Sequence, residues 1–333
     1  MRILAIDPLA PWGHINFNTF LLKALRSLGH VSFITFHDYH KHFTVDTAID
    51  IPDKRGLHRR DRTLRMGQPL ILDAILRTVH PADYDVVVFL CYESISMALK
   101  WPKDARVFVL EHNSTDKARG NPFKMFFYKR IPRSVIHLVF MEYIGNYISR
   151  TTGRRAIYIP HPYYSDPAVI SAKPATVKPE LIFCPSSGTR SRVLRPLKRF
   201  VEESDRYRLI AKGRREEDSP RCRVRRFFDD YETILAGCDM VFFGGEYEYR
   251  VSGVAHEAMS YGKPIATLNC LFGREFSKRF PHMVRPVDRM DEIGHLSFDP
   301  ETVRKEHVHF LRENGFEAIC AALREAFSAS GSA

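Results

Sequence analysis

Short apolar runs alternate with stretches of helical periodicity along most of the chain, and this alternation constrains the fold more than any other feature. The run at residues 84–90 is apolar from Val86 onward, which is typical of a strand buried on both faces of a parallel sheet. Further strands are expected at residues 2–7, 31–35, 106–110, 135–141, 156–160, 181–185, 207–211, 240–243 and 264–267, and helices at 15–28, 194–203, 229–236, 254–261 and 301–327. Such βα units in series predict an α/β protein with doubly wound parallel sheets, which bind ligands at the carboxyl ends of their strands.

The length indicates two domains. A chain of 333 residues is too long for one ordinary domain and suits two of roughly 150 to 180 residues each. Residues 161–178 are rich in Pro, Ser, Tyr and Ala without periodicity, as in an interdomain linker. We expect an N-terminal Rossmann-like domain at 1–165, a linker at 166–178, a C-terminal Rossmann-like domain at 179–305, and terminal helices at 306–333 that pack back on the N-terminal domain.

Composition excludes several classes of protein. The apolar fraction of 44% and the charged fraction of 27% are close to globular averages, which argues against a disordered or fibrous chain. No run of about 18 uncharged apolar residues occurs, and Asp7 interrupts the first apolar run before a signal-peptide core could form. The six cysteines are scattered without a CxxC pair, which suits reduced thiols in a cytoplasmic protein and offers no zinc site.

The formal net charge of +11 requires a negatively charged partner, which could be nucleic acid, a membrane surface or a phosphorylated substrate. Basic residues gather at 54–65, 117–133 and 190–226, and each cluster could also be a solvated face with no specific partner. Aromatic or apolar residues interrupt the first two clusters, which favours contact with an anionic membrane surface. The residues expected to make this contact, or to contact the acceptor, are Arg59, Arg60, Phe126 and Phe127.

Residues 240–264 predict an anion site. A strand runs into a turn that contains glycine, a helix begins near Gly253, and Gly262 ends it before the next strand. Free backbone amides at the start of such a helix, together with its dipole, bind a diphosphate. Glu257 lies about one turn inside the helix, where it could accept hydrogen bonds from ribose hydroxyls. Taken alone, Ser252 could simply cap the helix and Glu257 could face solvent.

This segment resembles the retaining, nucleotide-sugar-dependent glycosyltransferases of the GT-B fold, the large group 1, family 4-like enzymes. Their helix has an acid, seven other residues and a second acid, then Ala-Met, a small residue, Gly and Pro. The chain is similar at Glu257-Ala258-Met259 and Gly262-Lys263-Pro264, and Arg250-Val251-Ser252-Gly253 resembles a sub-branch of the family. The departure is Tyr249, which stands where the first acid is expected, so the role of that acid passes to Glu248 or is lost.

The resemblance implies two Rossmann-like domains that face a central cleft, with the acceptor bound by the first and the nucleotide sugar by the second. The implied catalytic residues are His112, Glu248 and Glu257. The expected donor-binding residues are Gly13, Arg190, Lys212, Arg250, Ser252, Gly253, Val254 and Glu257.

Several of these roles have alternatives. His112 follows an apolar strand, where a histidine could contact a sugar hydroxyl or assist a proton transfer, although a lone histidine can also be structural. Asp7, Glu93 and Glu111 are the other acid–base candidates at strand ends.

We therefore expect a glycosyltransferase that moves a sugar from a UDP- or GDP-linked donor to a glycan or lipid-linked acceptor in exopolysaccharide, lipopolysaccharide or glycolipid synthesis. Helix amides with Lys or Arg would stabilise the charge that develops on the departing diphosphate, so no metal is expected, and the resemblance implies retention. The protein is expected in the cytoplasm, on the inner face of the membrane. Alternatives are a nucleotide-sugar 2-epimerase or phosphorylase on the same fold, and a non-enzymatic nucleic-acid-binding protein, for which no helix-turn-helix or RNP-type motif is present.

Overall fold

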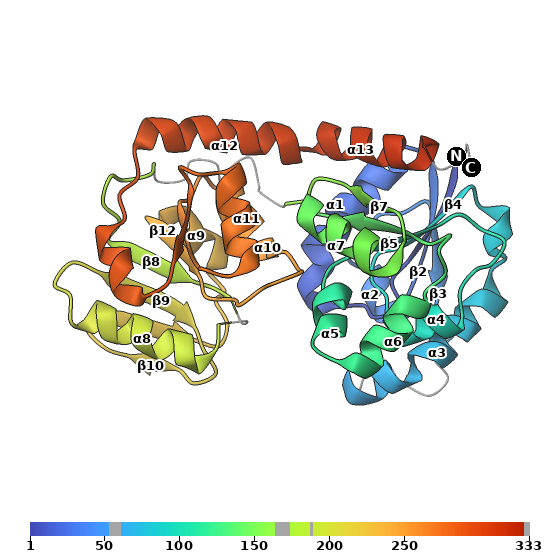
Figure 1. The fold of residues 1–333 in the computed structure, drawn as a ribbon, viewed down its shortest axis with the longest axis horizontal. Helices are drawn as coiled ribbons and strands as arrows, with labels where there is room; N and C mark the ends of the chain where they lie inside the picture. The colour runs from blue at the N-terminus through green and yellow to red at the C-terminus, as the bar shows by residue number, and fades with distance from the viewer. Residues whose placement is uncertain (53–60, 164–173, 187–188, 330–333) are drawn as a thin grey trace. The chain divides into compact units, whose positions relative to one another are not determined.

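The computed structural model describes the chain except residues 53–60, 164–173, 187–188 and 330–333, so Arg59 and Arg60 lie outside the described residues. The chain divides into two compact units (Figure 1). Unit 1 comprises Met1–Pro162, Tyr249–Val251 and Asn314–Ala333, and unit 2 comprises Tyr163–Glu248 and Ser252–Glu313.

Unit 1 is built on a seven-stranded sheet of order β3-β2-β1-β4-β5-β6-β7, in which every neighbouring pair is parallel. The strands are β1 (Arg2–Ile6), β2 (His30–Thr35), β3 (Thr47–Asp50), β4 (Val86–Phe89), β5 (Val107–Leu110), β6 (Ile136–Val139) and β7 (Ala156–Tyr158). The side chains of β4, β5 and β6 are buried at every position, as expected for central strands with both faces covered.

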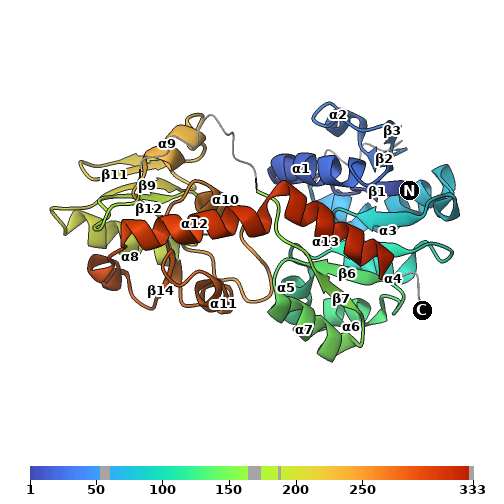
Figure 2. The ribbon, with the colours of Figure 1, turned by 90° about the horizontal axis from the view of Figure 1, so that it is seen from above.

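Helices cover both faces of this sheet. They are α1 (Ile15–Arg26), α2 (His37–His40), α3 (Asp61–Thr78), α4 (Ser94–Leu99), α5 (Ser114–Arg119), α6 (Pro122–Arg130), α7 (Glu142–Thr152) and α13 (Phe316–Ser328), with the 3-10 helices η1 (Trp12–His14) and η3 (Pro81–Asp83). In unit 1, α3, α4 and α6 lie on one face of the sheet, and α1 and α13 lie on the other (Figures 1 and 2). The Phe20 ring packs on Phe316, and the Arg106 guanidinium donates a hydrogen bond to the Phe327 carbonyl, so α13 is joined to this unit by apolar and polar contacts.

Unit 2 repeats the plan with a sheet of order β10-β11-β9-β8-β12-β13-β14, parallel except for the β10–β11 pair. Its strands are β8 (Leu181–Cys184), β9 (Arg208–Lys212), β10 (Glu217–Asp218), β11 (Cys222–Arg225), β12 (Met240–Phe243), β13 (Ile265–Leu268) and β14 (Val284–Val287). The strand order reverses between β8 and β12, and ligands of doubly wound sheets bind at such a switch point.

The helices of unit 2 are α8 (Ser191–Glu202), α9 (Tyr231–Gly237), α10 (Gly253–Ser260), α11 (Leu271–Arg279), η5 (Met290–His295) and α12 (Pro300–Asn314). In Figure 1, α8 lies on one face of the sheet, and α10 and α11 lie on the other, as right-handed crossovers require. The two doubly wound parallel sheets predicted from the sequence are confirmed.

The sequence analysis expects no helix or strand between residues 36 and 83, but the structure has β3 and α3 there, with the short helices α2 and η3. Strand β3 is at the sheet edge and none of its side chains is buried, so it has no apolar run that could reveal it. Strand β11 was also missed, since its buried positions alternate with arginines, and β14 contains Pro286. None of the helices in the described residues is long and apolar enough to cross a bilayer.

Candidate functional site

The turn between β12 and α10 has two glycines that local packing requires. A Cβ atom on Gly244 would lie 2.7 Å from Cγ2 of Thr189, and one on Gly245 would lie 2.4 Å from Cζ of Phe243. Real Cβ atoms do not approach other atoms so closely. The glycines therefore allow the chain to leave β12 and reach the start of α10.

Helix α10 begins at Gly253, as predicted, with Ser252 as its N-cap. The Ser252 hydroxyl accepts a hydrogen bond from the Ala255 N–H at 3.2 Å, so this side chain caps the helix. The N–H groups of Gly253 and Val254 belong to the first turn and have no partner within the helix, and the described part of the chain supplies none. The helix ends at Ser260, and Gly262, two residues later, has a φ of +67°, the left-handed conformation that glycine tolerates best. The start of α10 thus presents two amides to a ligand.

Glu257 lies one turn inside α10, and its carboxylate is held by a neighbour on α9. The Tyr231 hydroxyl donates a hydrogen bond to Glu257 Oε2 at 2.6 Å. Burial raises the pKa of Glu257 to about 7, although the Tyr231 hydrogen bond acts in the opposite direction. Tyr231 is a site residue that sequence reasoning missed, because nothing in a single sequence pairs a tyrosine with an acid 26 positions away.

Basic side chains of unit 2 lie at the carboxyl ends of β8 and β9. Arg190 and Arg192, at the start of α8, both pair with the Glu246 carboxylate, with Arg190 at 3.3 Å. Lys212 ends β9, and its Nζ lies 5.1 Å from the centroid of the Phe227 ring. The Phe227 side chain is 78% exposed. Arg192 and Phe227 were not predicted.

The segment at residues 240–264 is divided between the two units. Glu248 is half-buried and belongs to unit 2, whereas Tyr249–Val251, and hence Arg250, group with unit 1. The Tyr249 N–H donates to Asp116 Oδ1 at 3.0 Å, and the Tyr249 ring lies 4.1 Å from that of Tyr147. The tyrosine at the position of the expected acid therefore packs among side chains of unit 1.

His112 follows β5 at the carboxyl edge of the unit 1 sheet. Its Nε2 lies 2.9 Å from the Leu90 carbonyl, which can only accept, so Nε2 carries the hydrogen and Nδ1 has a free lone pair. Burial holds the pKa of His112 well below its usual value, which makes the ring neutral. A neutral ring with this tautomer can accept a hydrogen bond or a proton.

His14 is a second histidine at this edge, and it was not predicted. Its ring centroid lies 4.4 Å from that of His112, and its Nδ1 is buried with no partner among the described residues. Burial, with Lys117 and Arg250 nearby, lowers the pKa of His14 to about 4. Gly13, beside it, is exposed, and no atom lies within 4 Å of where its Cβ would be, so this backbone is open to a ligand. The sequence feature that could have identified His14 is the Gly13-His14 pair in the loop after the first strand.

The alternative acids are engaged within unit 1. The Asp7 carboxylate accepts hydrogen bonds from the Leu9 and Ala10 N–H groups, and burial raises its pKa to about 6. Glu93 is the N-cap of α4 and accepts from two of its amides, at 3.0 and 2.9 Å. Both carboxylates stabilise local backbone.

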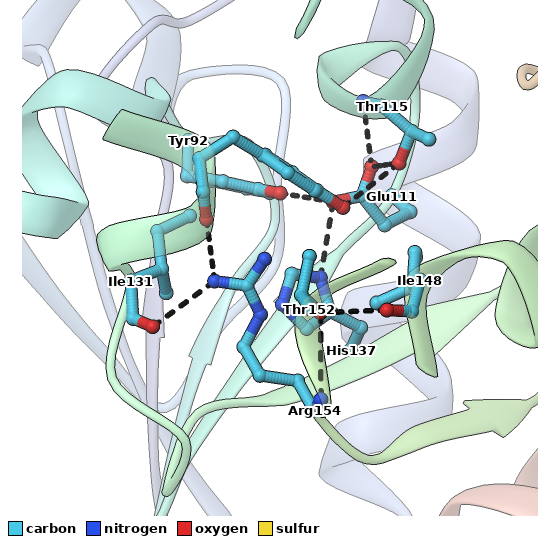
Figure 3. A network of polar contacts seen from close by, with 9 residues as sticks. Tyr92, Glu111, Thr115, Ile131, His137, Ile148, Thr152 and Arg154 are labelled. Carbon is cyan, nitrogen blue, oxygen red and sulfur yellow. Dashed lines mark hydrogen bonds and ion pairs between the residues drawn. The ribbon is translucent and has the colours of Figure 1, made fainter. Parts of the chain in front are cut away.

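Glu111 is the centre of a buried polar network (Figure 3). Its carboxylate accepts hydrogen bonds from four side chains and one backbone amide, supplied by Tyr92, Thr115, Tyr128 and His137. Burial alone would raise the pKa of Glu111, but these hydrogen bonds, that of His137 first, hold it below its usual value. Arg154 completes the network by donating to the carbonyls of Tyr128 and Ile131, at 2.5 and 3.0 Å. Glu111 therefore joins the end of β4, α5 and α6 to strand β6.

Phe126 and Phe127 lie on α6. The Phe126 side chain is 50% exposed, with the Arg130 guanidinium 3.6 Å from its ring centroid, and Phe123, one turn earlier, is 62% exposed. Phe127 is half-buried against both rings. The helix thus presents aromatic and basic groups together.

Two doubly wound sheets, each with polar groups at the carboxyl edge, define the GT-B fold that two-domain glycosyltransferases adopt. The structure is similar to Anabaena HepE, solved in complex with UDP and glucose, over 99% of this chain and 100% of that one, with 13% identity and a TM-score of 0.69. It is similar to Arabidopsis thaliana UGT89C1, solved with quercetin, over 98% and 99% of the two chains, with 15% identity and a TM-score of 0.58.

A third similar structure is described as a UDP-N-acetylglucosamine 2-epimerase from Listeria monocytogenes, with 12% identity, a TM-score of 0.51, and 96% and 90% of the two chains covered. No protein-family profile and no curated protein sequence matches the chain. At these identities the similarities show the fold, and the chain has the GT-B fold.

Proposed function

We propose that this protein is a glycosyltransferase that moves a sugar from a nucleoside diphosphate donor to a hydroxyl of a glycan or lipid-linked acceptor. The start of α10 carries the proposal. The N–H groups of Gly253 and Val254 can donate to a diphosphate, and Glu257, held by Tyr231, can accept from ribose hydroxyls one turn further on. These groups match the two parts that all nucleoside diphosphates share.

We propose a metal-independent reaction, in which groups of the protein stabilise the charge on the departing diphosphate. As the bond between sugar and phosphate breaks, negative charge grows on the phosphate oxygens, and fixed donors lower the barrier by stabilising it. The α10 amides, the helix dipole and the cations Arg190, Arg192 and Lys212 are the candidates in unit 2. Glu246 holds two of these cations, which limits their conformational freedom before the donor binds.

The nucleobase has a candidate position at the end of β11. A surface hollow of about 640 Å³ is lined there by Phe227 and Phe228, three arginines and acidic side chains. The exposed Phe227 ring offers a flat face on which a base can stack, and base–aromatic stacking is worth about 1–3 kcal/mol per base. We assign Phe227 to nucleobase binding.

Retention is proposed because residues 250–264 resemble the retaining enzymes. His14 favours a second mechanism, because its Nδ1, which has no partner among the described residues, could take the proton of an acceptor hydroxyl in a single displacement with inversion. The anomeric configuration of the product, read by nuclear magnetic resonance, distinguishes the two.

We further propose that the protein works at an anionic membrane surface in the assembly of a cell-surface polysaccharide or glycolipid. Exposed Phe123 and Phe126 with Arg130 on α6 support this, since aromatic rings insert at the bilayer interface while arginine contacts acidic headgroups. Replacement of Arg59 and Arg60 together should lower activity on a lipid-linked acceptor.

A thermal-shift panel of UDP-, GDP-, ADP- and dTDP-sugars tests the donor site. We expect one nucleotide class to raise the unfolding temperature, because a ligand that binds only the folded state stabilises it. Product analysis with and without acceptor then separates transfer from 2-epimerisation or phosphorolysis. No shift with any of these compounds contradicts the proposed function.

A further inference from the structure

Trp12 is a large aromatic side chain left in solvent at the carboxyl edge of the unit 1 sheet. It opens η1, the short 3-10 helix after the loop that follows β1, and its side chain is 61% exposed. Single exposed apolar residues are common, so exposure alone has no functional meaning. The exposure of Trp12 is significant because hydrogen bonds fix the loop that precedes it.

Side chains from four other elements fix the backbone before Trp12. The Asp7 carboxylate, at the end of β1, accepts from the Ala10 N–H at 2.8 Å and from Asn18 Nδ2 on α1 at 2.7 Å. Gln68 on α3 donates to the Pro8 carbonyl at 3.1 Å, and the Tyr39 hydroxyl on α2 donates to the Pro11 carbonyl at 3.1 Å. The loop is held in one conformation.

That conformation includes a strained residue. Ala10 has a φ of +40°, a left-handed conformation that costs an L-residue with a Cβ about 1–2 kcal/mol. A residue remains in such a conformation only where the surrounding structure imposes it, and such residues cluster at ligand sites.

The indole ring is itself held in place. It makes edge-to-face contacts with Tyr39 and His42, with ring centroids 5.7 and 5.4 Å away. The indole is therefore held by its neighbours while more than half of its side chain stays exposed.

The surroundings place Trp12 close to the two histidines at the carboxyl edge of the unit 1 sheet. Gly13 follows Trp12 and leaves its backbone open, and His14 comes next, with its ring 4.4 Å from that of His112. A sugar ring has one face of C–H groups and a rim of hydroxyls. It would match an exposed aromatic ring bordered by open backbone.

We propose that Trp12 is the platform on which a pyranose ring of the acceptor stacks, with the open backbone at Gly13 beside it as a hydrogen-bonding partner for the sugar hydroxyls. This inference rests on the proposed function and names the chemical class of the acceptor: its accepting end is a sugar, whether the rest is a free glycan or a glycolipid.

Fluorescence can observe this contact directly, because the chain has two tryptophans, Trp12 and Trp101. In the Trp101→Phe variant all tryptophan emission comes from Trp12. We expect a saturable change in this emission on titration with methyl pyranosides of the gluco, manno and galacto series. Emission that shifts with phosphatidylglycerol vesicles but with none of the pyranosides would make Trp12 a membrane anchor and overturn the proposal.

Kinetics provides the second measurement, with the pyranoside selected by the titration as acceptor. Trp12→Ala should raise the acceptor KM about tenfold and leave the donor KM and donor hydrolysis without acceptor unchanged. Trp12→Phe should have an intermediate acceptor KM, which keeps the test valid if the alanine variant folds poorly. An unchanged acceptor KM in a variant that still hydrolyses the donor overturns the role of Trp12 alone. If the wild-type protein bound no nucleotide sugar, that result would instead contradict the proposed function.

Discussion

At the scale of single residues, Glu257 is both a proposed ribose contact and a carboxyl group whose pKa is raised by burial. Its pKa of about 7, against an ordinary value of 4.5, means that the folded protein keeps a proton that the unfolded chain has released between these pH values. The contribution of Glu257 to folding stability is therefore fully present below pH 4.5 and lost as the pH rises through about 7. A donor whose ribose hydroxyls bind the carboxylate selects the ionised form.

We predict that the donor KM falls as the pH rises through about 7, and that Glu257→Gln removes this dependence and raises KM about tenfold or more. The unfolding temperature of Glu257→Gln minus that of wild type should increase as the pH rises from 4.5 to about 7, because only wild type must bury a charge. The exposed acid Glu232, on α9, supplies the control: Glu232→Gln should keep the dependence but move it to lower pH, because the Glu232 charge helps to raise the pKa of Glu257. A dependence that survives in Glu257→Gln would contradict the assigned role.

Phe227 makes a second prediction, on the nucleobase. Phe227→Ala should weaken UDP or GDP binding about tenfold, measured by calorimetry, since it removes a stacking face. Phe227→Trp should restore binding. Phe123→Ala removes a similarly exposed ring from unit 1 and should leave nucleotide affinity unchanged; equal losses in both variants would exclude stacking on Phe227.

How much of the site the sequence predicts depends on the distance along the chain between interacting residues. Ser252 as helix cap and Glu257 one turn further on follow from local spacing, and the structure has them there. His14 and His112 lie 98 positions apart and contact each other only because β1 and β5 end at the same edge of one sheet. Tyr231 and Glu257 meet in the same way across two helices. A single sequence has no record of such contacts.

At the scale of elements, the start of α10 can be altered one amide at a time. Ser252 has φ −108° and ψ 114°, the extended conformation that a residue before proline prefers, and Gly253 is the first helical position, where proline is tolerated. Gly253→Pro therefore removes one N–H group with little effect on the helix.

We predict that Gly253→Pro raises the donor KM about tenfold or more, the cost of one hydrogen bond to a charged group, while the unfolding temperature stays near that of wild type. Gly253→Ala keeps the N–H group and should bind donor like wild type. Steady-state kinetics with both variants decides. Equal KM values in the two variants would show that this amide does not contact the donor.

Elements differ in how well their sequences reveal them. Strands β4, β5 and β12 are buried at every position and appear as apolar runs, so they were predicted. Strand β11 alternates buried and half-exposed or exposed side chains and lies among arginines, so its apolar content is low. The strands that were missed, β3, β10, β11 and β14, all lie at or next to a sheet edge, where burial, the source of the apolar pattern, is weakest.

At the scale of the whole molecule, the net charge of +11 and the aromatic groups of α6 lead to one prediction about location. Phe123→Ser combined with Phe126→Ser should remove most binding to phosphatidylglycerol vesicles in a sedimentation assay, and raised salt should weaken what remains. Val308→Ser replaces an equally exposed apolar residue, 58% exposed on α12, and should have no effect. Wild-type protein that ignores anionic vesicles at physiological salt would contradict the membrane proposal.

The strained conformation of Ala10 also makes this residue a site at which acceptor specificity could be altered by substitution. Glycine at position 10 would relieve the left-handed strain and at the same time loosen the segment that presents Trp12. Ala10→Gly should therefore accept a wider range of acceptor sugars, each with a higher KM. Donor binding by unit 2 should not change. To broaden the acceptor range, position 10 is the first to randomise, with Trp12 itself kept.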